Sequence, residues 1–230
     1  TVPMQPEVQQ LSTSAAQVDP ASPDAPDAPA EPNDPCFNVS GKVQRIERRP
    51  VSGGPAAPVM VPVANAVIAM REEDTLFDDE YGRKLTDAAG NYSFSFCDDD
   101  GVFDDTLELY VRLRAQLNSG GRTVVEVEDS SWIDEVYEFD SSVISSDGGT
   151  HTINFNLDDE KSGIFNIADA VFQAWSVWNE SGGATGDDAI FQEAAEVHWE
   201  KNYGDTGSYY QSFWGEMTIA DDPSDPDQWD

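Results

Sequence analysis

LTDAAGNYSFSF, residues 85–96, decides the fold of this chain because it joins a turn signal to a strand signal. Asp87 and Gly90 bracket a short stretch of the kind that closes a tight turn, in which glycine supplies the backbone freedom. Three aromatic residues then follow at every second position from Tyr92, so they share one face of a strand. The stretch therefore predicts a turn that leads into a strand with one buried face.

Similar apolar alternation recurs on both sides of this stretch. The further predicted strands are residues 37–46, 58–70, 107–115, 123–127, 151–157, 195–199 and 216–220. Short strands divided by turns at such spacings are typical of an antiparallel β-sandwich. We therefore expect a mainly β protein.

Residues 164–178 interrupt the strand rhythm. Apolar side chains recur there at spacings of three and four, from Ile164 to Trp178, which predicts an amphipathic helix with a packed aromatic stripe. The helix and the last two predicted strands form a small α/β annex. The expected organisation is an extended arm at 1–35, a β-sandwich at 36–160 and the annex with an acidic end at 161–230.

Residues 1–35 contain eight of the fourteen prolines, six acids, no Lys or Arg and no aromatic residue. Such a segment cannot bury a core, so we expect an extended arm. Its weakly apolar residues Val2, Met4, Val8 and Leu11 can pair with a sheet edge of a neighbouring copy, which is a known mode of strand addition. The arm therefore predicts a homo-oligomer or a filament.

The chain is strongly acidic, with 45 Asp and Glu against 12 Lys and Arg and a net charge of −33. This balance argues against a nucleic-acid partner, because few groups are available to neutralise phosphates. The sequence also contains no apolar run of the roughly 18 to 20 residues that a membrane span needs. We expect a protein that spans no membrane.

Aspartates supply 28 of the acids, and the longest run lies within DDDGVFDD, residues 98–105. Short carboxylates in a tight turn are ligands that a hard cation prefers, so this loop predicts a Ca²⁺ site formed by Asp98, Asp100, Asp104 and Asp105. The loop differs from an EF-hand, because Gly101 comes too early and flanking helices are missing. A solvated acidic surface is the alternative.

Cys36 and Cys97 are the only cysteines, and neither lies in a Cys-x-x-Cys pair or near a histidine. Both fall at the ends of predicted strands, so they favour one disulfide, with two buried thiols as the alternative. A disulfide together with aspartate loops favours an extracellular or cell-surface location. The first residue, Thr1, is not Met, which fits a processed export product.

Three pieces of the chain carry a family resemblance: VSGKV at 39–43, AVI at 66–68 and TDAAGNYSF at 86–94. In order and spacing they resemble the carboxypeptidase-regulatory-like, or transthyretin-like, β-sandwich modules of secreted bacterial proteins. In those modules the Thr-Asp-x-x-Gly-x-Tyr-x-Phe pattern is a hairpin turn that leads into a core strand. The resemblance covers about residues 36–157 and implies a transthyretin-like or immunoglobulin-like sandwich.

A second resemblance concerns GIFNIADA at 163–170, VHW at 197–199 and DPDQWD at 225–230. These pieces are similar to the region before the zinc-binding helix of some large secreted bacterial metallopeptidase-like proteins. There the acidic stretch is expected to run into His-Glu-x-x-His. The two histidines of this chain, His151 and His198, lie far apart on predicted strands, so no catalytic residue of that family is transferred.

No motif of nucleophilic, phosphate or dinucleotide chemistry appears in the sequence, and we expect no enzyme. The expected function is that of a non-catalytic extracellular structural or surface protein that self-assembles and is stabilised by cations. The alternative is the N-terminal, non-catalytic part of a secreted zinc metallopeptidase. A third possibility is a ligand- or carbohydrate-binding module that uses the aromatic residues Tyr203, Tyr209, Tyr210, Trp214 and Trp229.

Overall fold

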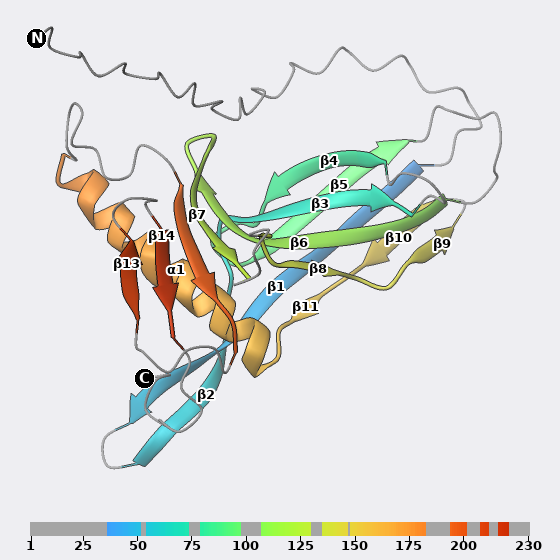
Figure 1. The fold of residues 1–230 in the computed structure, drawn as a ribbon. Helices are drawn as coiled ribbons and strands as arrows, with labels where there is room; N and C mark the ends of the chain where they lie inside the picture. Colours follow the sequence, from blue (N-terminus) through green and yellow to red (C-terminus); the bar gives the residue numbers. More distant parts are fainter. Residues whose placement is uncertain are drawn as a thin grey trace, which may run out of the picture.

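The computed structural model describes the residues 36–51, 54–73, 79–97, 107–129, 135–146, 148–182, 194–201, 208–211 and 216–220. The elements of these segments are strands β1 (Cys36–Val51), β2 (Gly54–Pro62), β3 (Ala66–Glu72), β4 (Glu80–Leu85), β5 (Asn91–Cys97), β6 (Leu107–Ser119), β7 (Arg122–Glu128), β8 (Glu138–Asp140), β9 (Ile144–Ser146), β10 (Gly149–Thr152), β11 (Phe155–Asn156), helix α1 (Asp159–Glu180), and strands β12 (Ala195–Trp199), β13 (Tyr209–Gln211) and β14 (Glu216–Ile219). The expectation of a mainly β protein with one helix is confirmed for these residues (Figure 1).

A five-stranded sheet is built around β1. The first half of β1 lies between β5 and β10, and its second half lies between β2 and β11. The pairs with β5 and β2 are antiparallel, whereas β10 and β11 run parallel to β1. The expectation of a wholly antiparallel sheet was therefore wrong here, because strand direction depends on long connections that local alternation does not encode.

A nine-stranded sheet has the order β13-β14-β12-β7-β6-β3-β4, with β8 and β9 also paired to β6. Strands β7, β12 and β14 are mutually parallel, and the other pairs are antiparallel. The strands of the predicted annex thus extend the sheet that contains β3 and β6. The division at residue 160 stays a prediction, and the described sheet contains strands from both sides of it.

The predicted strand at 58–70 is two strands, because the chain crosses between the sheets at 63–65. Asn65 has a positive φ of 62°, which ends the extended run. The buried hydroxyl of Thr86 donates to the carbonyl of Val63 and accepts from the amide of Ala66. This side chain satisfies backbone groups that the crossing removes from the ladders. In the same way, the predicted strand at 151–157 divides into β10 and β11.

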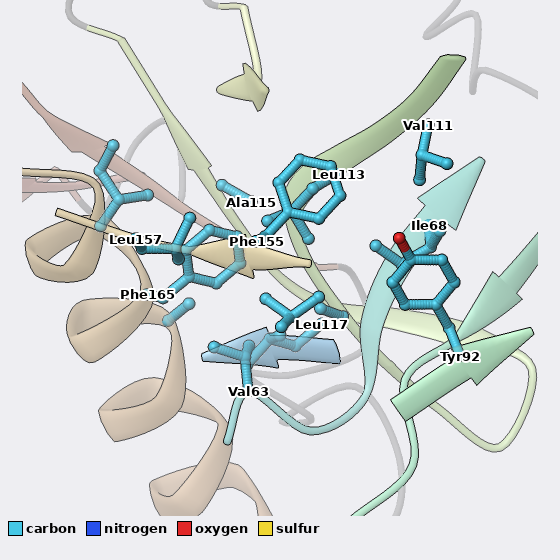
Figure 2. Close-up of a cluster of buried hydrophobic side chains, with 14 of the residues drawn as sticks. Val63, Ile68, Tyr92, Val111, Leu113, Ala115, Leu117, Phe155, Leu157 and Phe165 are labelled. Atoms are coloured by element: carbon cyan, nitrogen blue, oxygen red, sulfur yellow. The ribbon is translucent and has the colours of Figure 1, made fainter. Parts of the chain in front are cut away.

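The core lies between the two sheets and α1. Phe37, Val39 and Val43 of β1 share it with Ile68 of β3 and Leu113 of β6, all fully buried. Figure 2 shows how it continues towards the helix, where Leu157 and Phe165 lie beside Phe155. One continuous apolar cluster therefore joins both sheets to the helix.

Helix α1 confirms the predicted helix and begins five residues earlier, at Asp159. The carboxylate of Asp158 accepts from the amide of Lys161 and so caps the first turn. Ile164, Phe165 and Ala168 are buried against the sheets, whereas Val177 near the end of the helix is 69% exposed. In the described part of the chain, α1 is not apolar enough to cross a membrane.

The turn and strand at 85–97 fold as expected. Asp87 accepts hydrogen bonds from the amides of Ala89 and Asn91, and Gly90 has a φ of 79°. A Cβ atom on Gly90 would lie 2.5 Å from the carbonyl oxygen of Val43, so both conformation and space require glycine. Tyr92 is 5% exposed and lies on the core side of β5.

Candidate functional site

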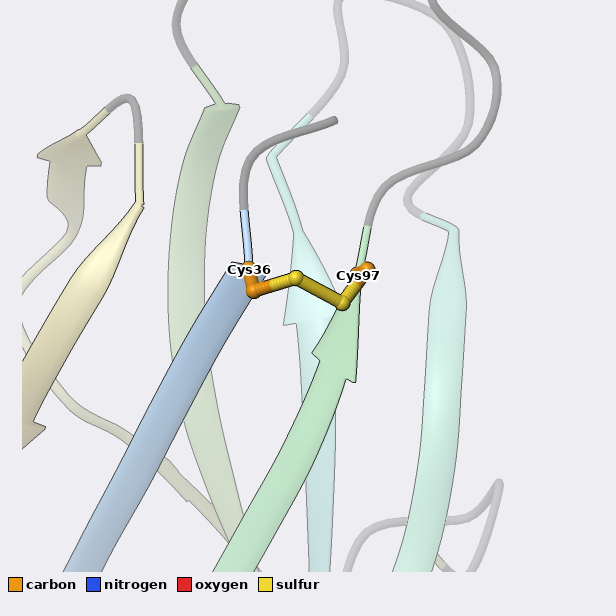
Figure 3. The surroundings of a disulfide bond; sticks show 2 residues. All are labelled: Cys36 and Cys97. Carbon is orange, nitrogen blue, oxygen red and sulfur yellow. A yellow bond between two sulfur atoms is a disulfide. The ribbon is translucent and has the colours of Figure 1, made fainter. Parts of the chain in front are cut away.

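A disulfide joins Cys36 at the start of β1 to Cys97 at the end of β5 (Figure 3). The two residues face each other in the antiparallel register, with their Cα atoms 4.0 Å apart and an S–S bond of 1.98 Å. The rings of Phe37 and Phe96 stack directly beside it, at 5.3 Å between centroids. The predicted disulfide is present, and the alternative of two free thiols is excluded.

The predicted calcium ligands Asp98, Asp100, Asp104 and Asp105 lie outside the described residues. In the part that the structure describes, no group of three or more His, Cys, Asp or Glu side chains is arranged to hold a metal ion. The chain connectivity still places this loop directly after Cys97, and the acidic arm directly before Cys36. The arm therefore ends, and the acidic loop begins, next to the two cysteines of one disulfide.

The other predicted contact residues are also mostly outside the described segments. The arm residues Val2, Met4, Val8 and Leu11 and the aromatic residues Tyr203, Trp214 and Trp229 lie there. Tyr209 and Tyr210 lie in β13, at one edge of the nine-stranded sheet. Their proposed roles in binding stay predictions.

A hollow of about 200 Å³ lies where β1 meets the first turns of α1. Two ion pairs line it: Arg48 with Asp159, at 2.9 Å, and Lys201 with Glu160, at 3.1 Å. Gly163 also lines the hollow. The hollow therefore offers two positive and two negative groups, all already paired and partly exposed, so a ligand would have to displace an ion pair.

Helix α1 caps the edge of β1 beside this hollow. The hydroxyl of Ser162 accepts from the amide of Ile46, and the amide group of Asn166, one turn later, donates to the carbonyl of Ile46. These two side chains supply the partners that a neighbouring strand would supply. The helix thus takes over the edge of β1 just beyond β11.

Arg45 of β1 strengthens this contact between β1 and α1. Its guanidinium donates to Asn166 at 2.6 Å, to the carboxylate of Asp169 at 2.7 Å and to the carbonyl of Pro62 at 3.3 Å. The Arg45 side chain is only 8% exposed, so its charge depends on these partners. The network positions the helix on β1, which is a structural role.

The outer face of the nine-stranded sheet, on the side opposite the core, carries charged residues in two unlike groups. On β6, Arg112 binds Asp140 through two hydrogen bonds of 2.7 and 2.8 Å, and Arg114 pairs with Glu138 at 3.1 Å. On β7, β12 and β14, glutamates occupy neighbouring positions of the register: Glu126, Glu196 and Glu216. The sequence indicates which residues leave the core face, but not that these three strands are neighbours.

Burial raises the pKa of Glu126, and the nearby positive charge of Arg114 opposes that rise. The neighbouring row contains Glu128 and His198, both mostly buried. The imidazole Nε2 of His198 lies 3.7 Å from a carboxylate oxygen of Glu216, and Nδ1 lies 3.5 Å from the carbonyl of Asp129. This part of the face is therefore rich in carboxyl groups and partly shielded from water.

His151, the other histidine, lies in β10 of the five-stranded sheet and stacks on Phe37 at 6.4 Å between centroids. His198 lies in β12 of the other sheet. The two imidazoles thus belong to different sheets and do not form a joint site.

Comparisons with known proteins assign no family to the chain. No family model and no curated protein matches it. Among solved structures, a 9R-lipoxygenase from Cyanothece PCC8801 is similar over 58% of this chain and 18% of the lipoxygenase chain, at 15% identity and a TM-score of 0.30. The chain therefore spans less than a fifth of that enzyme, and so low a score carries no argument about fold or function.

Proposed function

We propose that the chain is a non-catalytic extracellular structural module, built on a transthyretin-like sandwich, that self-assembles through its N-terminal arm. The observation that carries the proposal is the disulfide between Cys36 and Cys97, because such bonds persist in oxidising compartments. The polar networks around Arg45 and Thr86 support a structural role, since they satisfy backbone and charged groups at joints of the fold.

The sheet edges restrict how an arm can add to the fold. The ribbon of β1 and β2 projects from the rest of the molecule (Figure 1), and β2 is its outer strand. The backbone N–H of Val63 donates to the carbonyl of Val43 in β1. Because successive backbone groups of a strand point to opposite sides, the backbone nitrogens of residues 58, 60 and 62 point away from β1. Pro58 and Pro62 have no N–H, which leaves Met60 as the donor there.

Strand addition at β2 is therefore disfavoured by the missing donors. The path of the nine-stranded sheet ends at β4 and β13, and these two edges are the better acceptors for an arm. The arm is acidic, and β4 contains Lys84 as well as Arg83, which is already paired with Glu80 of the same strand. Opposite charge favours β4 as the contact.

Assembly is tested by light scattering after size exclusion, at high protein concentration with Ca²⁺. We expect oligomers from the full chain and monomers after deletion of residues 1–35. A matched variant with Val2, Met4, Val8 and Leu11 changed to Ser keeps the length and charge of the arm and should also be monomeric. A full chain that stays monomeric under these conditions would refute self-assembly.

Cation stabilisation is tested separately by thermal unfolding with Ca²⁺ and with a chelator. We expect Ca²⁺ to raise the Tm of the protein and Asp100→Ala to abolish that rise, because one ligand is lost. Asp79→Ala removes an exposed carboxylate elsewhere and serves as the control for charge alone. An unchanged Tm of the unaltered protein with and without Ca²⁺ would exclude the site.

A second candidate is the N-terminal, non-catalytic part of a secreted zinc metallopeptidase. The region of the chain that resembles those proteins supports this candidate. In this region α1 packs against a sheet that contains the parallel strands β12 and β14 and the antiparallel edge strand β13. The test is the encoding reading frame: a continuation past Asp230 into His-Glu-x-x-His favours this candidate. A stop codon after Asp230 would remove it.

A further inference from the structure

The outer face of the nine-stranded sheet brings three glutamates into one row. The register pairs Glu126 of β7 with Glu196 of β12, and Glu196 with Glu216 of β14. Neighbouring strands lie about 4.8 Å apart, and in-register residues point to the same face. On its other side, Glu126 faces Gln116 of β6. Glu126 therefore lies between the carboxyl group of Glu196 on one side and the side-chain amide of Gln116 on the other.

Like charges in directly neighbouring strand positions destabilise a sheet. Partial burial adds to this cost at Glu126 and raises its pKa. Gln116 is 8% exposed and donates its amide hydrogen to Thr123, while its buried amide oxygen has no hydrogen-bond partner among the described residues. A carboxylate cannot serve that oxygen, because it has no proton to donate. A protonated carboxyl group can.

The charged groups around the row come from every neighbouring element. They are Arg114 on β6, Glu128 on β7, His198 on β12, Glu216 on β14, and Asp129, Glu135 and Glu138 in the described residues between β7 and the end of β8. Arg114 is the permanent cation of this set, and it already pairs with Glu138. Arg114 opposes the rise of the Glu126 pKa, so burial is the cause of that rise.

We propose that Glu126 donates a carboxyl proton within this row, to the amide oxygen of Gln116 or to the carboxylate of Glu196. Ionisation of Glu126 then loosens the pairing of β7 with β12. The folded protein binds this proton more tightly than the unfolded chain does. Stability is therefore full below the ordinary Glu pKa of about 4.3 and falls as the pH rises through the higher pKa of the folded state.

The variant Glu126→Gln tests the proposal, because Gln keeps the donor and cannot ionise. We expect it to raise Tm by roughly 2–4 °C at about pH 8 and to leave Tm unchanged at about pH 4. Glu196→Gln removes the neighbouring charge and should give a smaller rise with the same pH dependence. Glu108→Gln, on the exposed side of β6, measures the background effect of removing one carboxyl charge from this acidic chain.

A direct measurement keeps the test independent of variant folding. The side-chain carboxyl carbon of Glu126, assigned by NMR in the unaltered protein, is followed through a pH titration. A midpoint clearly above about 4.3 supports the proposal. A midpoint at or below that value, or a Tm difference between Glu126→Gln and the unaltered protein that is equal at both pH values, would overturn it.

Discussion

The two halves of the nine-stranded sheet share one core but balance their charges differently. The half with β3, β4 and β6 shares its core with the disulfide-linked strands β1 and β5, and arginines on its outer face are paired with carboxylates. The half with β7, β12 and β14 contacts α1 through β7 and β12, the helix also reaches β6, and the outer face of this half carries the glutamate row. Apolar packing is thus common to both halves, whereas paired charges are concentrated in one, and the disulfide lies in the five-stranded sheet that packs against it.

The difference teaches how a chain with so few cations distributes them. Of the twelve basic residues, Arg71, Arg83, Lys84, Arg112 and Arg114 lie on β3, β4 and β6. Among β7, β12 and β14, Arg122 at the start of β7 is the one Lys or Arg. The half with β7, β12 and β14 therefore carries its glutamates with few neighbouring cations.

The largest effect should come from the apolar contact between the halves. Phe165→Ala removes a fully buried ring that α1 inserts beside Phe139 and Leu157. We expect a loss of about 3–5 kcal/mol in the free energy of unfolding, measured by urea titration. Val177→Ala, at an exposed position of the same helix, is the control and should cost less than about 0.5 kcal/mol. Equal losses would contradict the proposed packing.

Removal of the disulfide should rank next. Cys36→Ser with Cys97→Ser opens a link between residues 61 positions apart, which enlarges the conformational freedom of the unfolded chain. We expect a loss of about 2–4 kcal/mol, measured by urea titration of both proteins under non-reducing conditions. Addition of a reductant should destabilise the unaltered protein and leave the double variant unchanged. A reductant effect on the double variant would contradict this explanation.

The polar joint between β1 and α1 should give a smaller loss. Arg45→Met keeps much of the side-chain volume but leaves the Asn166 oxygen without its donor and Asp169 with Gln173 alone, so we expect about 1–3 kcal/mol of destabilisation. Asp169 is 29% exposed at its side chain, and water therefore limits the penalty. Arg48→Met breaks the exposed pair with Asp159 and should cost less than about 1 kcal/mol. A larger loss of stability from Arg48→Met than from Arg45→Met would contradict the structural role given to Arg45.

The smallest effect should come from the turn before β5. Hydrogen bonds from the backbone and side chain of Asn91 and the amide of Ala89 lower the pKa of Asp87. The stability that this group adds is present above the ordinary pKa of about 3.9 and is lost as the pH falls through the lower folded value. Asp87→Asn should therefore lower Tm slightly at about pH 7 and not at about pH 2. A larger decrease at low pH would contradict the sign.

Local patterns in the sequence predicted the elements better than their partners. The turn at 86–90, the strand with Tyr92 on its buried face and the start of the aromatic stripe of α1 at Ile164 follow from periodicities that act within a few residues. Asn65 shows the limit: its positive φ divides an apolar run between two sheets, and no residue spacing in the run marks that crossing.

The pairing of distant strands could not be predicted from alternation. The parallel pairs of β1 with β10 and of β7 with β12 depend on connections that span many residues. The disulfide could be predicted, because it needs only two suitably placed cysteines. The row formed by Glu126 and Glu196 could not, because it depends on the pairing of distant strands. A carboxyl row becomes visible only when the register of separate strands is known.

Hydrogen exchange, measured strand by strand, tests the contrast between the disulfide-linked strands and the strands of the glutamate row most directly. At about pH 8, Glu126→Gln should slow exchange in β7, β12 and β14 relative to the unaltered protein and leave β1 and β5 unchanged. The double Cys→Ser variant should speed exchange in β1 and β5 more than in β12 and β14. Equal changes across all these strands in both variants would contradict the account.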